Sequence, residues 1–123
     1  LHPALDSFPD HGLWKRDFLG SSGVFSIVFT RAASSHVAAS LDALKVFAIG
    51  ASWGGTRSLA APMSIAGFRS ATAWSGPDVI LRISIGLEDE RELWDDVERV
   101  LAAVEAKSSA AASEASLKPA RLG

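Results

Sequence analysis

The chain has 123 residues, of which 48% are apolar and 21% are charged, and its formal net charge is -2. This size and balance fit one globular domain and exclude a two-domain enzyme, a disordered chain and a membrane-spanning chain within these residues. No excess of positive charge is available for nucleic acid or an anionic membrane, and the absence of cysteine excludes disulfides, thiolate nucleophiles and Cys-type zinc sites.

The start of the chain indicates a piece of a longer protein, because Leu1 is not a methionine and no signal segment follows it. Residues 1–10 contain two prolines and predict an irregular entry segment. Residues 11–18 have apolar side chains at helical spacing and predict a short helix. The glycines and serines of residues 20–23 resemble a phosphate-binding loop only loosely, since the lysine and the spacing of such a loop are missing, and a plain turn is favoured.

Three elements are predicted in the next stretch of the chain. Residues 24–30 alternate between apolar and mixed positions, which predicts a strand with Phe25, Ile27 and Phe29 on its core face. A helix of about three turns is predicted after Ser34 or Ser35, either of which can cap it. A short apolar run at 46–49 then ends at a glycine-containing turn.

The following stretch predicts two more strands. Residues 57–61 favour a short extended piece that ends at Pro62. Residues 79–85 alternate clearly, with apolar side chains on one face and Arg82 on the other. An arginine on the face away from the core meets a ligand anion, an internal carboxylate or water, because burying it without a partner is costly.

The last predicted element is an amphipathic helix that begins after Asp89, which with Glu92 resembles a capping box. The acidic residues in its first turn or on its polar side are interpreted as solvated side chains, namely Glu88, Glu90, Glu92, Asp95 and Asp96. Residues 107–123 are rich in alanine and serine without periodicity, so a disordered tail is expected there and a folded domain over 1–106.

These elements predict an α/β fold of the α+β type, with a small mixed or antiparallel sheet, helices on one face and the other face uncovered. No catalytic constellation is visible. The three histidines, His2, His11 and His36, lack the spacing of metal ligands, so no metal site is predicted.

Four ordered blocks carry a family resemblance: HPAL at 1–4, LWKRDFLGSSGVFSIVF at 13–29, SWGG at 52–55 and ILRISIGLED at 80–89. Together they resemble the carboxyl-terminal domain of the cystathionine β-lyases, within the pyridoxal-phosphate-dependent family of Cys and Met metabolism. The chain departs from the family pattern at Ala51, Arg57 and Ser84.

The resemblance implies a fold-type-I enzyme whose cofactor, pyridoxal 5'-phosphate, is bound mainly by an amino-terminal domain outside this chain. None of the lysines, which are Lys15, Lys45, Lys107 and Lys118, lies in the family's Schiff-base motif, so no catalytic residue is expected here and the chain alone is expected to be inactive. By the same resemblance Arg82 holds the substrate α-carboxylate, assisted by Ser52 and Trp53.

The implied activity is β-elimination of cystathionine, a sulfur amino acid, to homocysteine, pyruvate and ammonia. Trp53 favours a β-lyase, because the related γ-synthases and γ-lyases commonly have leucine there. Those γ-type enzymes and a non-catalytic α/β binding module are the alternatives. The resemblance also implies a homo-oligomer, chiefly a tetramer, and the cytoplasm is the expected location.

Overall fold

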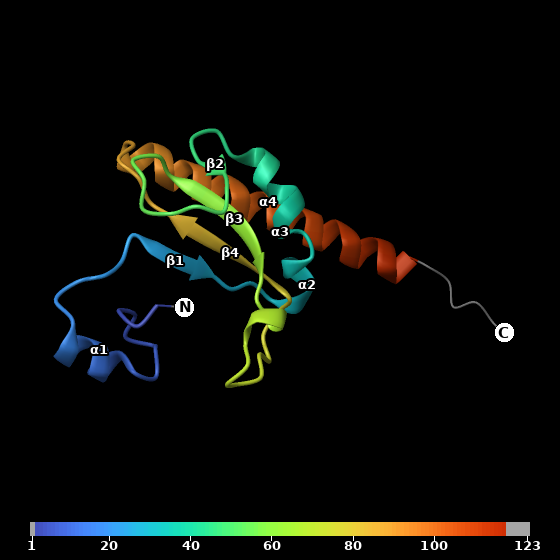
Figure 1. Cartoon of the computed structure of the whole chain (residues 1–123). Helices are drawn as coiled ribbons and strands as arrows, with labels where there is room; N and C mark the ends of the chain where they lie inside the picture. The colour runs from blue at the N-terminus through green and yellow to red at the C-terminus, as the bar shows by residue number, and fades with distance from the viewer. Residues whose placement is uncertain (1, 118–123) are drawn as a thin grey trace.

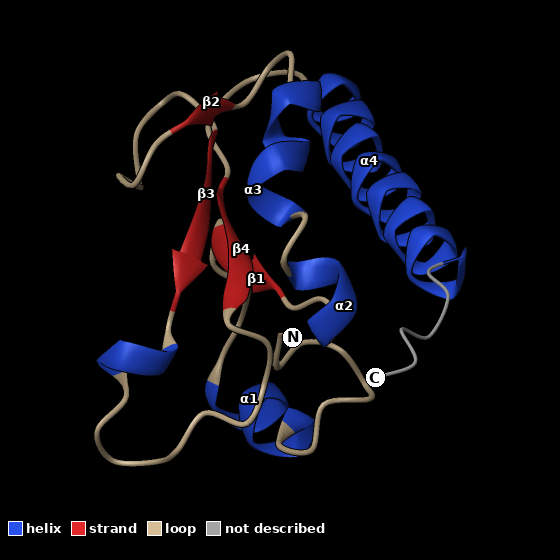
Figure 2. Cartoon of the chain, turned by 90° about the vertical axis from the view of Figure 1, so that its right-hand side faces the viewer, coloured by secondary structure: helices blue, strands red, loops and turns tan. Residues whose placement is uncertain are grey.

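A four-stranded sheet with helices on one face organises the chain (Figure 1). The computed structural model describes residues 2–117. In chain order the elements are α1 (His11–Asp17), β1 (Val24–Ile27), α2 (Arg31–Ser34), α3 (Val37–Ser40), η1 (Leu41–Ala43), β2 (Ala48–Ile49), β3 (Leu59–Ser64), η2 (Ala66–Phe68), β4 (Val79–Ser84) and α4 (Glu90–Leu117). In Figure 2 the helices α2, α3 and α4 lie together on one side of the sheet, which confirms the predicted fold class.

The strands follow the order β1-β4-β3-β2. β4 pairs antiparallel with both β1 and β3, whereas β2 runs parallel to β3, so the sheet is mixed. The side chains of β4 alternate between the helical layer and the opposite face, because successive residues of a strand point to opposite sides.

The core lies between the sheet and the helices. Leu81 and Ile83 of β4 are buried in it, as the alternation of residues 79–85 predicts. Phe25, Ile27 and Phe29 pack against the same cluster and are partly buried, which confirms their predicted face although β1 already ends at Ile27. The buried apolar cluster consists of Val37, Leu41, Phe47, Ala60, Leu81, Ile83, Leu93, Val100 and Val104.

β3 runs through Pro62, so the predicted stop at this proline is wrong. β2 pairs only with Leu59 and Ala60, and beyond them β4 is the strand that β3 pairs with. Proline has no backbone N–H and is tolerated in a strand where one side carries no partner. At Pro62 the side of β3 away from β4 is such an edge.

Between β1 and β2 the chain forms three short helical turns, α2, α3 and η1, where the sequence predicts one continuous helix. The hydroxyl of Thr30 caps the first turn, accepting a hydrogen bond from the N–H of Ala33 at 3.3 Å, so the predicted caps are wrong. Instead, Ser34 and Ser35 donate to backbone carbonyls three residues earlier, at 3.0 and 3.1 Å. Such bonds compete with the regular helical pattern, which accounts for the breaks.

α4 begins as predicted, because the Asp89 carboxylate accepts hydrogen bonds from the N–H groups of Arg91 at 2.9 Å and Glu92 at 3.3 Å. The helix continues to Leu117, so a disordered tail is wrong over residues 107–117. Alanine, the strongest helix former, recurs in this stretch. Residues 118–123 of the predicted tail lie outside the described residues. Neither α4 nor another helix within 2–117 is long and apolar enough to cross a membrane.

Asp96 of α4 is fully buried, so its assignment to the solvated side of the helix is wrong. Its carboxylate accepts hydrogen bonds from the N–H groups of Lys45, Val46 and Phe47 at 2.6–3.0 Å. Arg99 also contacts it. Burial is the largest single influence and raises the pKa of Asp96, but the three N–H groups and Arg99 outweigh it and hold the pKa below its ordinary value.

Candidate functional site

Arg82 lies in β4 on the sheet face opposite the helices, as predicted. Its register partners across the sheet are Ser26 of β1 and Ala61 of β3. Residues opposite one another on neighbouring strands share a face, so both small side chains lie beside Arg82. They leave room around the guanidinium group on this side of the sheet.

The turn between β2 and β3 brings Ser52 and Trp53 to Arg82. Nη2 of Arg82 donates to the carbonyl oxygen of Ser52 at 3.0 Å and also to that of Ala51. The guanidinium carbon lies 5.4 Å from the centroid of the Trp53 ring, within the range of a cation–π contact. The three predicted site residues therefore lie together, and the carbonyl of Ser52 is the group that contacts Arg82.

Arg82 retains most of its hydrogen-bonding capacity. A guanidinium group carries five N–H donors, and within residues 2–117 only Nη2 of Arg82 has an acceptor. No carboxylate in this part of the chain forms an ion pair with it. The internal carboxylate considered as an alternative to a ligand is thus not found among the described residues. Trp53, at 66% exposure, leaves this side of the site open.

Gly54 gives the turn its shape. Its φ of 75° is a left-handed backbone conformation that residues with a side chain disfavour. The N–H of Gly54 donates to Ser84 Oγ at 3.2 Å, and Ser84 is only 1% exposed. The turn therefore covers part of the sheet face that the sequence predicts to be uncovered.

The far end of the same segment is held by Glu88, which lies between β4 and α4. The Glu88 carboxylate accepts hydrogen bonds from the hydroxyl and from the N–H of Ser58, each at 2.7 Å. Ser58 Oγ in turn accepts from the N–H of Gly86 at 2.7 Å. We refer to these three bonds as the Ser58–Glu88 clasp. The pKa of Glu88 is held below its ordinary value. The hydrogen bond from the Ser58 hydroxyl contributes most to this, the bond from the Ser58 N–H comes next, and the charge of Arg57 lowers the pKa further.

Sequence reasoning missed the clasp and interpreted Glu88 as a solvated acid, which is wrong for a carboxylate bonded to Ser58. The two residues are 30 positions apart and belong to no spacing pattern. Only the pairing of β3 with β4, which sets Leu59 opposite Ser84, brings them together.

The described lysines lie on other elements: Lys15 on α1, Lys45 before β2 and Lys107 on α4. The strands β1, β3 and β4 and the turn at residues 51–58 contain no lysine. Lys118 lies outside the described residues. The surroundings of Arg82 thus offer no amine for a Schiff base and do not by themselves fit pyridoxal phosphate. Within residues 2–117 no group of three or more His, Asp or Glu side chains could hold a metal ion.

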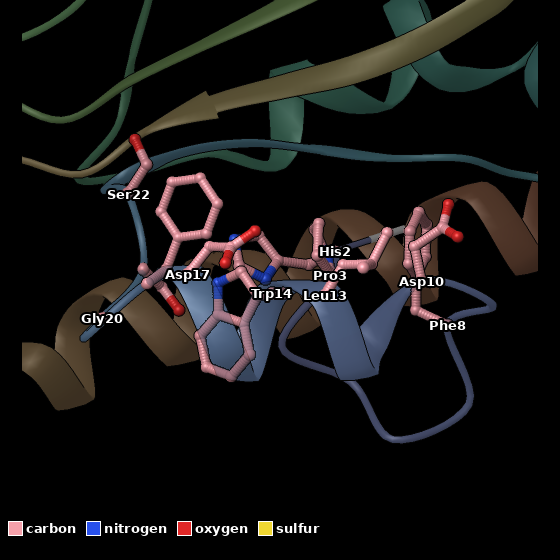
Figure 3. A pocket seen from close by; sticks show the side chains of 11 residues that line it. His2, Pro3, Phe8, Asp10, Leu13, Trp14, Asp17, Gly20 and Ser22 are labelled. Carbon is pink, nitrogen blue, oxygen red and sulfur yellow. The ribbon is translucent and has the colours of Figure 1, made fainter.

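A separate hollow lies beside α1 (Figure 3), with a volume of about 470 Å³. Its lining comes from the entry segment, from α1 and from residues 20–22. Trp14 is half-buried there beside the rings of His2 and His11, with ring centroids 6.5 and 5.6 Å away. Arg82 does not line this hollow, so it is distinct from the candidate site.

Comparison with known proteins places the sequence among pyridoxal-phosphate enzymes. The sequence profile of the Cys/Met metabolism PLP-dependent enzymes matches residues 1–102. A protein of Rhizobium johnstonii, provisionally named a cystathionine β-lyase, is 47% identical over 113 residues, covering 86% of this chain and 28% of that protein. The L-alanine/L-glutamate racemase of Wolbachia pipientis wMel is 41% identical over 104 residues, covering 83% of this chain and 26% of that protein. The chain thus spans about a quarter of the length of these relatives.

A solved structure shows the same fold within a longer chain. The crystal structure of cystathionine γ-synthase from Xanthomonas oryzae pv. oryzae in complex with cystathionine matches with a TM-score of 0.66 and 32% identity. The match covers 85% of this chain and 28% of that chain. The sheet and helices described above therefore correspond to a portion of that larger chain.

Proposed function

The chain belongs to the Cys/Met metabolism PLP-dependent enzymes, and from this we propose that residues 1–106 form the substrate-recognition domain of a carbon–sulfur lyase. The proposed substrate is cystathionine, which reacts with water to give homocysteine, pyruvate and ammonia. Arg82 binds the substrate α-carboxylate, with Ser52 and Trp53 beside it. The observation that carries this proposal is the guanidinium group of Arg82, which keeps free donors and has no carboxylate partner in the described part of the chain.

The chemistry of Arg82 suits a carboxylate, because its free Nε and Nη1 donors belong to a cation and hydrogen bonds from an ionised donor to a carboxylate are strong. The bonds from Nη2 to the carbonyls of Ala51 and Ser52 restrain the plane of the guanidinium group. Its remaining donors then have a defined direction, and a carboxylate bound to them holds the substrate in one orientation. The Trp53 ring lies beside the guanidinium group at cation–π distance and further restrains its position.

In this proposal the part of the protein outside the chain supplies the Schiff-base lysine and most contacts to the cofactor phosphate. Two observations support this division. The strands and the turn around Arg82 contain no lysine, and the chain spans only about a quarter of its relatives. Assembly into a homo-oligomer, expected as a tetramer, and a cytoplasmic location remain predictions.

A β-lyase is favoured over the γ-type enzymes of the same family. The Rhizobium relative with a β-lyase name is 47% identical to this chain, whereas the cystathionine γ-lyase of Mus musculus is 36% identical. Trp53, where γ-type enzymes commonly have leucine, supports the same choice.

Racemisation of an amino acid is a second candidate, because the Wolbachia racemase is 41% identical. A carboxylate-binding arginine would serve that reaction equally well, since it recognises the α-carboxylate that both kinds of substrate share. The two activities differ in their products, so product analysis separates them.

The test uses the complete protein, expressed from a gene that includes the sequence upstream of Leu1, with pyridoxal phosphate. We expect it to release pyruvate and homocysteine from cystathionine. Conversion of L-alanine to D-alanine without cleavage of cystathionine would favour the racemase. A protein that binds no pyridoxal phosphate and acts on neither substrate would support the non-catalytic binding module instead.

A further inference from the structure

We propose that Glu88, acting through Ser58, is a positioning residue that holds the turn at residues 51–58 against Arg82. Neither Glu88 nor Ser58 has a hydrogen bond to Arg82, so the effect on the site is indirect. The inference rests on the proposed function, because it concerns how the substrate-binding arginine and its turn are kept together.

Side chains of strand β4 and of the residues after it hold the turn at three places. At its start, Arg82 donates to the carbonyl of Ser52 at 3.0 Å. In its middle, the N–H of Gly54 donates to Ser84 Oγ at 3.2 Å. At its end stands the clasp, whose bonds are each 2.7 Å long. The same short stretch of chain therefore supplies the substrate-binding cation and the anchors of the turn beside it.

The clasp is a stronger attachment than the bond from Gly54 to Ser84. Two of its three bonds are accepted by the ionised carboxylate of Glu88, and charge-assisted hydrogen bonds are about twice as strong as neutral ones. Ser58 is 0% exposed, so water does not compete for its hydroxyl. Nearby, the N–H of Leu87 donates to the carbonyl of Thr56 at 2.8 Å, which brings the two backbones together. Loss of the clasp would therefore loosen the end of the turn, which the bond from Leu87 to Thr56 would still hold in part.

The test replaces Glu88 in the complete protein by Glu88→Gln, which keeps the shape of the side chain and removes its charge. We expect KM for cystathionine to rise about tenfold, since small misplacements of binding groups have effects of this size or larger. We expect kcat to change less than about twofold, because Glu88 touches no reacting atom. The amide hydrogen of Gly54, which donates to Ser84, should exchange severalfold faster in the variant.

The control is Glu90→Gln, an exposed acid two positions away in the first turn of α4. It removes the same charge without touching Ser58, and it should leave KM and the exchange of the Gly54 amide hydrogen unchanged. A second variant, Ser58→Ala, removes the hydroxyl that links Glu88 to Gly86 and should reproduce the rise in KM. If Glu88 acts through Ser58, the double variant should be no worse than the poorer single variant.

The outcomes separate the inference from the proposed function. Unchanged exchange of the Gly54 amide hydrogen in Glu88→Gln overturns the positioning role, whether or not the protein is a lyase. Faster exchange with an unchanged KM also overturns it, because the clasp would then order the turn without affecting binding. A wild-type protein that does not cleave cystathionine contradicts the proposed function alone, and the exchange measurement still tests the clasp. If Glu88→Gln does not fold, KM and the exchange of the Gly54 amide hydrogen are compared between Ser58→Ala and the wild type. Unchanged values of either in Ser58→Ala then overturn the positioning role.

Discussion

The carboxylate of Asp96 accepts a hydrogen bond from the backbone N–H of Phe47 at 2.9 Å, across 49 positions of sequence. Both groups are buried, and the same carboxylate serves the two preceding N–H groups. Buried backbone N–H groups need an acceptor, and here a side chain of α4 provides it in place of a strand. The link between α4 and the start of β2 is therefore polar as well as apolar.

Replacing Asp96 by alanine should strongly destabilise the fold. We expect Asp96→Ala to lower the free energy of unfolding by about 3–5 kcal/mol, because each buried donor left without an acceptor costs about 1–3 kcal/mol. Urea unfolding followed by circular dichroism measures the difference. The neighbouring Asp95 is exposed, so Asp95→Ala should change stability by no more than about 0.5 kcal/mol. Equal effects of the two substitutions would contradict the role given to Asp96.

The same carboxylate predicts a dependence of stability on pH. The pKa of Asp96 is lower in the folded chain than its ordinary value of 3.8, so the unfolded chain takes up the proton first as the pH falls. The stabilisation is fully present above about pH 5, and it is lost as the pH falls through 3.8 towards the lowered pKa of the folded state.

This dependence should be visible against Asp96→Asn, which cannot titrate. Between about pH 5 and pH 3 the wild type should lose stability more steeply than the variant, as measured by urea midpoints at several pH values. Glu88 also has a lowered pKa, but it is present in both proteins and its contribution cancels in the comparison. Parallel curves would rule out a lowered pKa at Asp96.

Local patterns in the sequence predict most of the fold. The alternation of residues 79–85 identifies β4 and the face of Arg82, and apolar spacing with Asp89 identifies the start of α4. The errors arise where distant pairing decides the outcome. Pro62 lies within β3 because β2 has already ended beside it, and the helix before β2 breaks where serine hydroxyls bond to the backbone.

The residues of the candidate site also fall into those that local sequence signals predict and those that only the tertiary fold reveals. Arg82, Ser52 and Trp53 follow from a strand pattern and from family blocks, both of which are local signals. The Ser58–Glu88 clasp and the burial of Asp96 depend on contacts between residues 30 and about 50 positions apart. Glu88 resembles an ordinary acidic residue near a helix start, and Asp96 resembles one on the polar side of a helix. Only the tertiary fold supplies the N–H groups from which each carboxylate accepts hydrogen bonds.

Gly86 tests the close approach of the two backbones at the clasp. A Cβ atom there would lie 2.4 Å from the carbonyl oxygen of Thr56 and 2.6 Å from the nitrogen of Ser58. Gly86→Ala should therefore lower the free energy of unfolding by about 1–3 kcal/mol, the usual range for overpacking. Gly20, which has no atom within 4 Å of the corresponding position, provides the control Gly20→Ala. Similar thermal midpoints for both variants would contradict this prediction, because residues 56–58 would then move away from residue 86 at little cost in stability.

Arg82 should control the use of substrate without controlling the cofactor. In the complete protein, Arg82→Ala should lower kcat/KM for cystathionine about ten- to a hundredfold, because hydrogen bonds to charged groups contribute about 1.5–3 kcal/mol. Bound pyridoxal phosphate, measured by its visible absorbance, should stay near one per subunit, since the contacts around Arg82 are to the turn and not to a lysine or a phosphate cradle. For Arg82→Lys, kcat/KM should lie between the values of the wild type and of Arg82→Ala, because lysine keeps the charge but not the planar guanidinium group whose donors are fixed in direction.

The matched control for this prediction is Arg91→Ala, which removes an exposed arginine from the first turn of α4. It lowers the net charge of the domain by the same amount, so any general electrostatic effect on an anionic substrate would appear in both variants. A specific carboxylate contact predicts that only Arg82→Ala loses activity and that added salt does not remove the difference. Loss of the cofactor in parallel with activity would instead assign Arg82 to the binding of pyridoxal phosphate.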